Sequence, residues 1–250
     1  MFNFFATENN KKDSHYIIDG KDYNHIKNVL RMEIGDTCLI SCEGKSDLCK
    51  IADFFDDAVY FEIIEENYTD TELPTKIYLF QGLPKSDKME YIIQKCVELG
   101  VYAIVPVRMK HCIVKLDDKK AKGKQTRWQS ISESAAKQSK RNIIPEIMDV
   151  CSLGEALEFA KTLDLILVPY ENKEGMTATQ EALKELKNAK SVGIFIGPEG
   201  GFEKKEIEKT LEANAKIISL GKRILRTETA AMTAVGMCML SVEMQNDNLE

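Results

Sequence analysis

Two glycine-rich turns near the carboxyl end of the chain carry the residues best suited to chemistry. The first turn is Gly197-Pro198-Glu199-Gly200-Gly201, and the second begins at Gly221 and leads into Arg226 and Glu228. Because glycine has no side chain, such turns let backbone groups approach a flat ligand closely. A carboxylate can accept a proton and a guanidinium can stabilise negative charge. Glu199, Arg226 and Glu228 are therefore candidate catalytic groups.

Both glutamates also have purely structural interpretations. Glu199 can be a turn residue that bonds to the backbone, and the sequence does not favour either role. Glu228 can be a charge that the helix dipole favours at a helix N-terminus, and this is the preferred interpretation of that residue.

Several common enzyme classes leave no pattern in this chain. The first turn is not a phosphate loop, because the lysine of GxxxxGK[ST] is missing, and neither GxGxxG after a strand, HExxH nor CxxC occurs. The only histidines stand at positions 15, 25 and 111, and no Ser-His-Asp arrangement can be argued. Hydrolases and metalloenzymes therefore have little support, and no metal site is expected.

Short apolar runs precede both turns and predict the strands that position them. Residues 194–196 end at the first turn and residues 217–220 end at the second, so each run is expected to be a buried strand. Residues 203–213 between them are expected to form a surface helix. Ligands of α/β proteins bind at the carboxyl edge of the sheet, and we expect the two turns to lie side by side there.

The remaining pattern predicts two domains. Residues 1–70 alternate short apolar segments with turns, interrupted by one helix at 23–31, which is typical of a small β-barrel. The polar segment 67–75 is the expected linker. Residues 76–245 alternate strands with helices, which predicts a parallel sheet with helices on its faces. The expected strands are 77–80, 102–107, 163–168 and 192–196, with an extended segment at 143–147, and the expected helices are 86–99, 124–140, 153–160 and 179–188.

The last predicted helix, residues 229–242, has almost no polar face. A helix that is apolar all round is buried on all sides. At the end of a chain this favours burial of part of its surface against a second subunit, and burial within one chain is the alternative.

Charge is distributed unevenly along the chain. Residues 1–70 carry 7 Lys/Arg against 15 Asp/Glu, residues 76–145 carry 15 against 6, and residues 146–250 carry 12 against 18. The basic third is either a solvated face or a surface that contacts phosphates, and charge alone does not separate the two.

Cysteine usage and hydropathy indicate a cytoplasmic protein. The seven cysteines show no framework of paired spacings, so reduced thiols are expected. No apolar run is long enough to cross a membrane, and the N-terminus lacks the pattern of a signal peptide. No membrane partner is expected.

Several segments together resemble a known family. IGPEGGF at 196–202 and LGKRILRTETA at 220–230 resemble the two C-terminal motifs of the SPOUT RNA methyltransferases. These two sequences are most similar to those of the RsmE-type enzymes, which methylate N3 of a uridine in 16S ribosomal RNA of the small subunit. Residues 95–101, 127–128 and 138–145 resemble further segments of that family, and HIKNVLRM at 25–32 resembles its N-terminal PUA-like barrel.

The resemblance implies a fold, a cofactor and partners. The fold would be a SPOUT domain with a deep trefoil knot, preceded by a PUA-like barrel that helps to hold RNA. S-adenosyl-L-methionine would be the cofactor, and 16S ribosomal RNA or the small ribosomal subunit would be the substrate. The enzyme would be a homodimer packed through its C-terminal helix.

Candidate residues can be named for the two ligands that the resemblance implies. The cofactor would contact Val168, Pro169, Ile196, Gly197, Pro198, Glu199, Gly200, Gly201, Leu220, Gly221, Ile224, Leu225, Arg226 and Thr229. Ribosomal RNA would lie across the basic third of the chain, and the candidate contacts, chosen for their charge, are Arg31, Lys85, Lys88, Arg108, Lys110, Arg127 and Arg141.

Two positions depart from the family pattern. His111 stands where an arginine is expected, which affects the RNA contacts of its loop, and Lys140 stands where a glycine is common. Two other functions remain open: a methyltransferase of the same fold that acts on another RNA such as tRNA, and an RNA-binding protein without catalysis.

Overall fold

The chain forms two compact units. The computed structural model describes residues 1–170 and 175–246. Unit 1 contains Met1–Glu72 and Ala136–Ile144, and unit 2 contains Leu73–Ala135 and Pro145–Glu250. Segment Ala136–Ile144 therefore belongs to unit 1 although it lies far along the chain from the rest of that unit.

Unit 1 is built on one curled sheet of six strands. The strand order is β1-β4-β5-β6-β3-β2, with β1 parallel to β4 and the other neighbours antiparallel. Its strands are β1 (Asn3–Phe5), β2 (Lys11–Lys12), β3 (His15–Asp19), β4 (Thr37–Cys42), β5 (Lys45–Phe54) and β6 (Ala58–Thr69). Alternate residues of these strands, among them Tyr16, Ile40 and Phe61, point into one apolar core. The segment η1 (Glu8–Asn10) is a short 3-10 turn.

The helix expected at 23–31 begins earlier and changes its winding. α1 (Gly20–Asn24) continues into a π-helical turn, η2 (His25–Val29), which buries Ile26. Arg31 then takes a φ of 54°, which ends the helix. The difference arises because apolar periodicity marks the buried face of a helix but does not fix its ends.

One buried carboxylate on β5 joins that strand to three others of unit 1, β2, β3 and β6. Asp47 Oδ2 accepts hydrogen bonds from Lys11 Nζ at 3.0 Å and from the Tyr16 hydroxyl at 2.9 Å, and Asp47 Oδ1 accepts from the Asn67 backbone N–H at 2.8 Å. Burial raises the pKa of Asp47, but these donors outweigh it and hold the pKa below its ordinary value. A buried charge is tolerated here because it is paired and hydrogen-bonded.

Unit 2 is a parallel sheet, as its alternating pattern predicted. The path of paired strands is β10-β8-β7-β12-β11-β13, β9 pairs with β8, and every pairing is parallel. The strands are β7 (Lys76–Gly82), β8 (Ala103–Arg108), β9 (Glu146–Ile147), β10 (Cys151–Ser152), β11 (Leu165–Pro169), β12 (Ser191–Ile196) and β13 (Lys216–Ile218).

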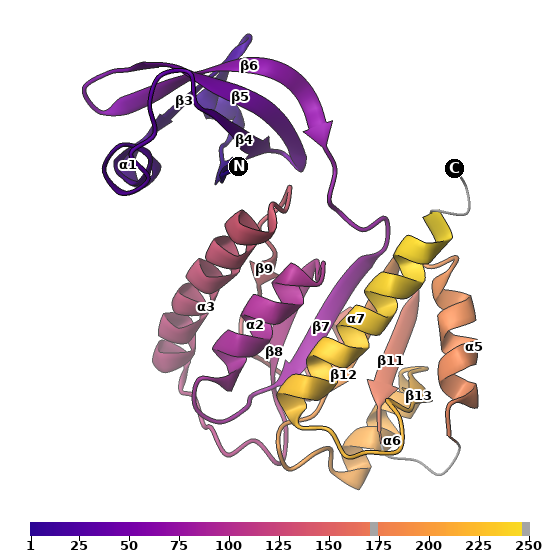
Figure 1. The fold of residues 1–250 in the computed structure, drawn as a ribbon. Helices are drawn as coiled ribbons and strands as arrows, with labels where there is room; N and C mark the ends of the chain where they lie inside the picture. The colour runs from indigo at the N-terminus through magenta and orange to yellow at the C-terminus, as the bar shows by residue number, and fades with distance from the viewer. Residues whose placement is uncertain (171–174, 247–250) are drawn as a thin grey trace. The chain divides into compact units, whose positions relative to one another are not determined.

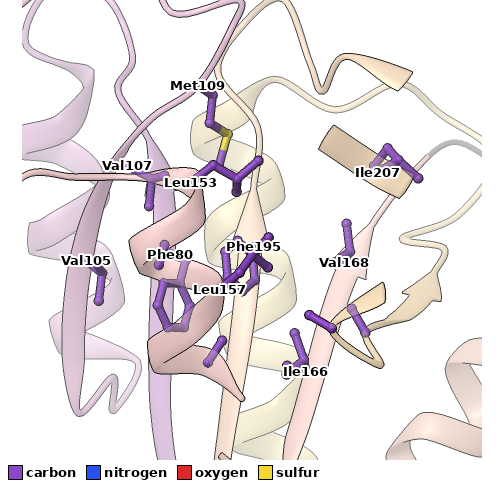
Figure 2. Close-up of a cluster of buried hydrophobic side chains, with 14 residues drawn as sticks. Phe80, Val105, Val107, Met109, Leu153, Leu157, Ile166, Val168, Phe195 and Ile207 are labelled. Atoms are coloured by element: carbon purple, nitrogen blue, oxygen red, sulfur yellow. The ribbon is translucent and has the colours of Figure 1, made fainter. Parts of the chain in front are cut away.

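Helices cover both faces of this sheet. The helices are α2 (Lys88–Glu98), α3 (Asp118–Ser139), α4 (Leu153–Ala160), α5 (Thr177–Leu186), α6 (Lys204–Glu212) and α7 (Thr227–Asn246). α7, in yellow, packs against α2, α5, β7 and β12 (Figure 1). The opposite face packs against α4 and α6, where Leu157 covers the stacked rings of Phe80 and Phe195, whose centroids are 4.3 Å apart (Figure 2).

The predicted strands and helices of residues 76–245 are present, with shifted ends. α4 has the predicted bounds because Ser152 and Glu155 form a capping box at its start. α3 begins at Asp118, six residues before the predicted start. The seven cysteines are all free thiols. Among the described residues, no helix is long and apolar enough to cross a bilayer.

The ends of α2 and α3 have the same geometry but different residues. After α2, the Gly100 N–H donates to Val97 O and the Val101 N–H donates to Cys96 O, with Gly100 at a φ of 87°. After α3, Lys140 occupies the equivalent place with a φ of 59°. The left-handed conformation that this cap requires is strained for any residue with a Cβ atom. The turn before Arg141 therefore forms without the glycine that the family resemblance led us to expect.

Replacing Lys140 with glycine should therefore stabilise the protein. Lys140→Gly is expected to raise the free energy of unfolding by about 1 kcal/mol, because the strain of the left-handed backbone is removed. The measurement is urea unfolding followed by circular dichroism. The control, Ser134→Gly in the exposed middle of α3, should lower the free energy of unfolding by about 0.5 kcal/mol. Destabilisation by both changes would contradict this account of the cap.

Candidate active site

Two adjoining cavities lie at the carboxyl edge of the sheet in unit 2. One, of about 400 Å³, is lined by the segment 219–225 together with Pro169, Tyr170 and Ala230. The other, of about 550 Å³, shares Pro169, Tyr170, Ile224, Leu225 and Ala230 with the first and extends over the turn 196–202 to Arg226, Thr227 and Lys88. Their combined size matches that of ordinary small-molecule sites.

Both predicted glycine turns line this site, but their strands are not neighbours. β11 lies between β12 and β13 in the sheet. The end of β11 therefore contributes Pro169 and Tyr170 to both cavities. The prediction that the turns meet at the carboxyl edge is confirmed, with the end of a third strand between them.

The hydroxyl of Thr227 joins the start of α7 to the first turn. Thr227 Oγ1 donates to Gly197 O at 2.7 Å and accepts from Gln81 Nε2 at 2.9 Å. Gln81 Nε2 also donates to Gly82 O at 2.9 Å. β7, the turn after β12 and the first residue of α7 are thereby connected through one buried threonine, which is 5% exposed.

Two glycines allow neighbouring segments to pack closely on the first turn. A Cβ atom on Gly200 would lie 2.8 Å from the Cβ of His111, and one on Gly82 would lie 2.7 Å from Pro198 Cδ. His111 Nδ1 is 3.0 Å from Gly200 O and 3.2 Å from Gly201 O. Because both partners are carbonyl oxygens, Nδ1 must carry the proton and donate it. His111 thus holds the first turn, residues 197–201. It stands at the position where the family resemblance led us to expect an arginine.

An ion cluster lies at the second cavity, which two of its members, Lys88 and Glu199, line. Lys88 Nζ lies 3.2 Å from Glu199 Oε1 and 3.2 Å from Glu228 Oε2. Glu199 Oε1 also accepts from the Lys85 backbone N–H at 3.0 Å. Burial raises the pKa of Glu199, but backbone donors from Glu199 and Lys85 and the Lys88 ammonium outweigh it, so the pKa lies below its ordinary value. A lowered pKa makes Glu199 a weaker base and favours its interpretation as a residue that holds the turn.

Most residues assigned to the cofactor line one of the two cavities. Two do not: the assignment of Val168 is corrected, and that of Thr229 stays a prediction. Val168 is fully buried in the core of the sheet, where no ligand can reach it. Thr229 is exposed on the first turn of α7 and lines neither cavity, and Thr227 takes the inward position instead.

Sequence reasoning missed some residues of the site. Tyr170, Phe202, Ser219 and Ala230 line the cavities. Lys88, which the sequence analysis assigned to RNA, also lines the second cavity, from the first position of α2. Tyr170 directly follows Pro169 at the end of a predicted strand. This position at the carboxyl edge of the sheet could have predicted that Tyr170 lines the site. Nothing in the sequence placed Lys88 beside two glutamates so far away in the chain.

The residues assigned to RNA have different surroundings. Arg31, Lys85 and Lys110 are exposed. Arg127 is exposed and forms an ion pair with Glu90, while Arg108 donates to Val150 O at 3.1 Å and contacts Asp118.

Arg141 is not available to RNA, and this assignment is corrected. Arg141 is only 3% exposed, and its Nε donates to both carboxylate oxygens of Glu72, at 2.9 and 3.1 Å. The Arg141 carbonyl also accepts from Asn3 Nδ2 at 2.9 Å. This arginine holds segment 136–144 within unit 1.

Two family models match the chain. The model described as an RNA methyltransferase domain matches residues 71–239, and the model described as an RNA methyltransferase PUA domain matches residues 18–63. The first match covers the site described above and the second lies in the curled sheet of unit 1.

Similar proteins and structures agree with these models. Ribosomal RNA small subunit methyltransferase E of Bacillus subtilis is 40% identical over 234 residues, which are 92% of this chain and 91% of the relative. The crystal structure of such an enzyme from Neisseria gonorrhoeae, bound to S-adenosyl methionine, is 31% identical, with a TM-score of 0.79 over 95% of this chain and 96% of that one. A putative methyltransferase of Legionella pneumophila, also with S-adenosyl methionine, is 30% identical, with a TM-score of 0.82 over 96% of this chain and 97% of that one.

The paired motifs, the cavities that they line and these similarities all lead to one assignment. The chain belongs to the RNA methyltransferase family and groups with the ribosomal RNA small subunit methyltransferases E.

Proposed function

We propose that the protein transfers a methyl group from S-adenosyl-L-methionine to N3 of a specific uridine in 16S ribosomal RNA. The observation that carries this proposal is the pair of adjoining cavities between the turns 197–201 and 219–227. The relatives named as small-subunit methyltransferases, and the similar structures that contain the cofactor, support the same reaction.

The residues of the cavities fit S-adenosyl-L-methionine. Glycine-rich backbone supplies main-chain donors and acceptors, and Leu220, Leu225 and Ala230 supply apolar surface for a flat base. Ile224 is 85% exposed at the same site, which is unusual for an isoleucine and suits a residue that covers a ligand. When bound, the cofactor supplies an electrophilic methyl group on a positively charged sulfur.

Two charged side chains are proposed to act on the uridine. N3–H of uracil is only weakly acidic, so the site must accept its proton and stabilise the negative charge that remains. Glu228 is the proposed acceptor of the proton, because it pairs with Lys88, which lines the cavity, and because the pKa of Glu199 is lowered. Arg226 lines the cavity with an exposed side chain and is proposed to stabilise O2 or O4 of the base.

Ribosomal RNA is proposed to contact cations at the surface of the basic third of the chain and of unit 1, all exposed except the partly buried Arg108. The candidates that keep this role are Arg31, Lys85, Arg108, Lys110 and Arg127. Contacts of cations with phosphates release counterions, so binding should weaken as salt is added. We further propose that residues 1–70 bind RNA and that residues 76–245 carry the reaction. The deep knot implied by the family resemblance remains a prediction.

A homodimer through α7 is proposed on the exposure of that helix. One face of α7 is buried in unit 2, but Leu240 is 48% and Met244 is 61% exposed. Tyr91 on the adjoining α2 is 47% exposed. Apolar side chains exposed on neighbouring helices suit contact with a second copy of the chain.

The function is tested by methylation of defined RNA. Purified protein with S-adenosyl-L-methionine should form N3-methyluridine, measured by mass spectrometry of nucleosides, in small subunits from cells that lack the enzyme. Arg226→Ala should lower the rate about 100-fold or more because it removes stabilisation of the developing negative charge. Lys209→Ala, on the exposed face of α6, is the control and should react as the wild type does.

Other outcomes would favour the alternatives. Methylation of tRNA but not of ribosomal RNA would assign the protein to another substrate. Binding of RNA without any methyl transfer, in protein that also fails to bind S-adenosyl-L-methionine in calorimetry, would identify a non-catalytic RNA-binding protein.

A further inference from the structure

The ammonium group of Lys88 has a position that RNA backbone contact does not explain. Lys88 is the first residue of α2, and its side chain lies in the wall of the larger cavity between Glu199 and Glu228. Only 31% of the Lys88 side chain is exposed, against 26% for Glu199 and 16% for Glu228. The cluster of one cation and two anions has a net charge of −1, so it repels a phosphate rather than attracting one.

The donor inventory of Lys88 leaves one hydrogen available. An ammonium group has three N–H donors and no acceptor. The ammonium forms ion pairs with Glu199 and with Glu228, each at 3.2 Å, and within residues 1–170 and 175–246 no third partner of this group lies at hydrogen-bond distance. The remaining N–H is therefore available to a polar atom that enters the cavity.

The same cluster keeps Lys88 charged. The ion pair with Glu199 raises the pKa of Lys88, burial acts in the opposite direction, and the pair with Glu228 raises the pKa further. A lysine with a raised pKa remains a donor at neutral pH and cannot serve as the base. Its available chemistry is stabilisation of negative charge.

We propose that Lys88 is a catalytic residue that donates its third N–H to a carbonyl oxygen of the target uracil, next to N3. This inference rests on the proposed function and adds a second cation to Arg226. As the N3 proton moves to Glu228, that carboxylate becomes neutral while the uracil becomes negative. The charge of the cluster changes from −1 to 0 in the same step. Because the protonated Glu228 no longer offsets the positive charge of Lys88, that charge acts more strongly on the uracil anion as it forms.

Replacement of Lys88 with a neutral side chain of similar length tests this assignment. Lys88→Met should lower the single-turnover rate of uridine methylation, at saturating cofactor, about 100-fold or more, because one donor to a developing oxyanion is lost. Its dissociation constant for S-adenosyl-L-methionine, measured by calorimetry, should stay within about threefold of the wild type, since the loss falls on the transition state.

Two further variants separate chemistry from folding. Lys95→Met, on the same helix, removes a lysine that is 34% exposed and paired with Glu98, and it should react as the wild type does. Lys88→Arg restores a cation with several donors and should recover at least about tenfold of the rate lost in Lys88→Met. Thermal unfolding of all three variants checks that they are folded.

The pH dependence gives a readout that a structural role would not change. If Lys88 stabilises the uracil anion, the wild-type rate reaches its plateau at lower pH than the rate of Lys88→Met. The other charged groups that face Lys88 are Glu199 and Glu228, and Arg226 lines the same cavity. An upward shift of the alkaline limb in Lys88→Met therefore reports on the uracil.

The outcomes distinguish this inference from the proposed function. An active wild type with a Lys88→Met variant that keeps more than about a third of its rate would overturn the role of Lys88 alone. Equal losses of rate and cofactor affinity, with an unchanged pH profile, would assign Lys88 to holding the cavity wall and would also overturn it. A folded wild type that binds S-adenosyl-L-methionine but methylates no ribosomal RNA would overturn the proposed function and this inference together.

Discussion

The hydrogen bonds of the Thr227 hydroxyl are the interaction on which the rest of the site depends. Thr227 Oγ1 gives its proton to the carbonyl of Gly197 and receives one from Gln81, so a single buried group fixes three segments. Leaving a buried donor or acceptor without its partner costs about 1–3 kcal/mol of folding free energy, so displacing either segment from Thr227 is unfavourable. The turn 197–201 and the start of α7 therefore keep one relative position, and the cavities between the two glycine turns exist because they do.

Electrostatics at the cavity wall follow from this fixed geometry. Because α7 begins at Thr227, its second residue, Glu228, lies close to Glu199, and the N-terminal residue of α2 places an ammonium between them. The cluster carries a net negative charge beside the exposed guanidinium of Arg226. This arrangement suits a site in which a positively charged cofactor and a neutral base meet and a proton is removed.

Local patterns predicted the turns of this site and missed its long-range contacts. The glycines, the apolar runs before them and the capping box of α4 are visible within a few residues, and these features appear in the structure. The place of β11 between β12 and β13 is decided by packing of the whole sheet, so the contribution of Tyr170 could not be inferred from spacing. Val168 was assigned to the cofactor through the family resemblance, but alternation along the strand points its side chain into the core.

Partners of charged residues were likewise not predictable from the local sequence when they lie far along the chain. Arg141 was predicted to contact RNA because it lies in a basic segment, yet its partner Glu72 stands 69 positions away in the sequence and buries it. The apolar character of the last helix was visible from composition alone. Which of its sides remains exposed became visible only when α2, α5 and the sheet were seen to cover the other one.

The central claim is that the Thr227 hydroxyl holds the cofactor site together, and binding of S-adenosyl-L-methionine measured by isothermal titration calorimetry tests it most directly. Thr227→Val should bind the cofactor at least about tenfold more weakly than the wild type, because Gly197 O and one Gln81 N–H lose their partner. Thr227→Ser, which keeps the hydroxyl, should bind within about threefold of the wild type. Equal affinity of the wild type and a folded Thr227→Val variant would contradict the account.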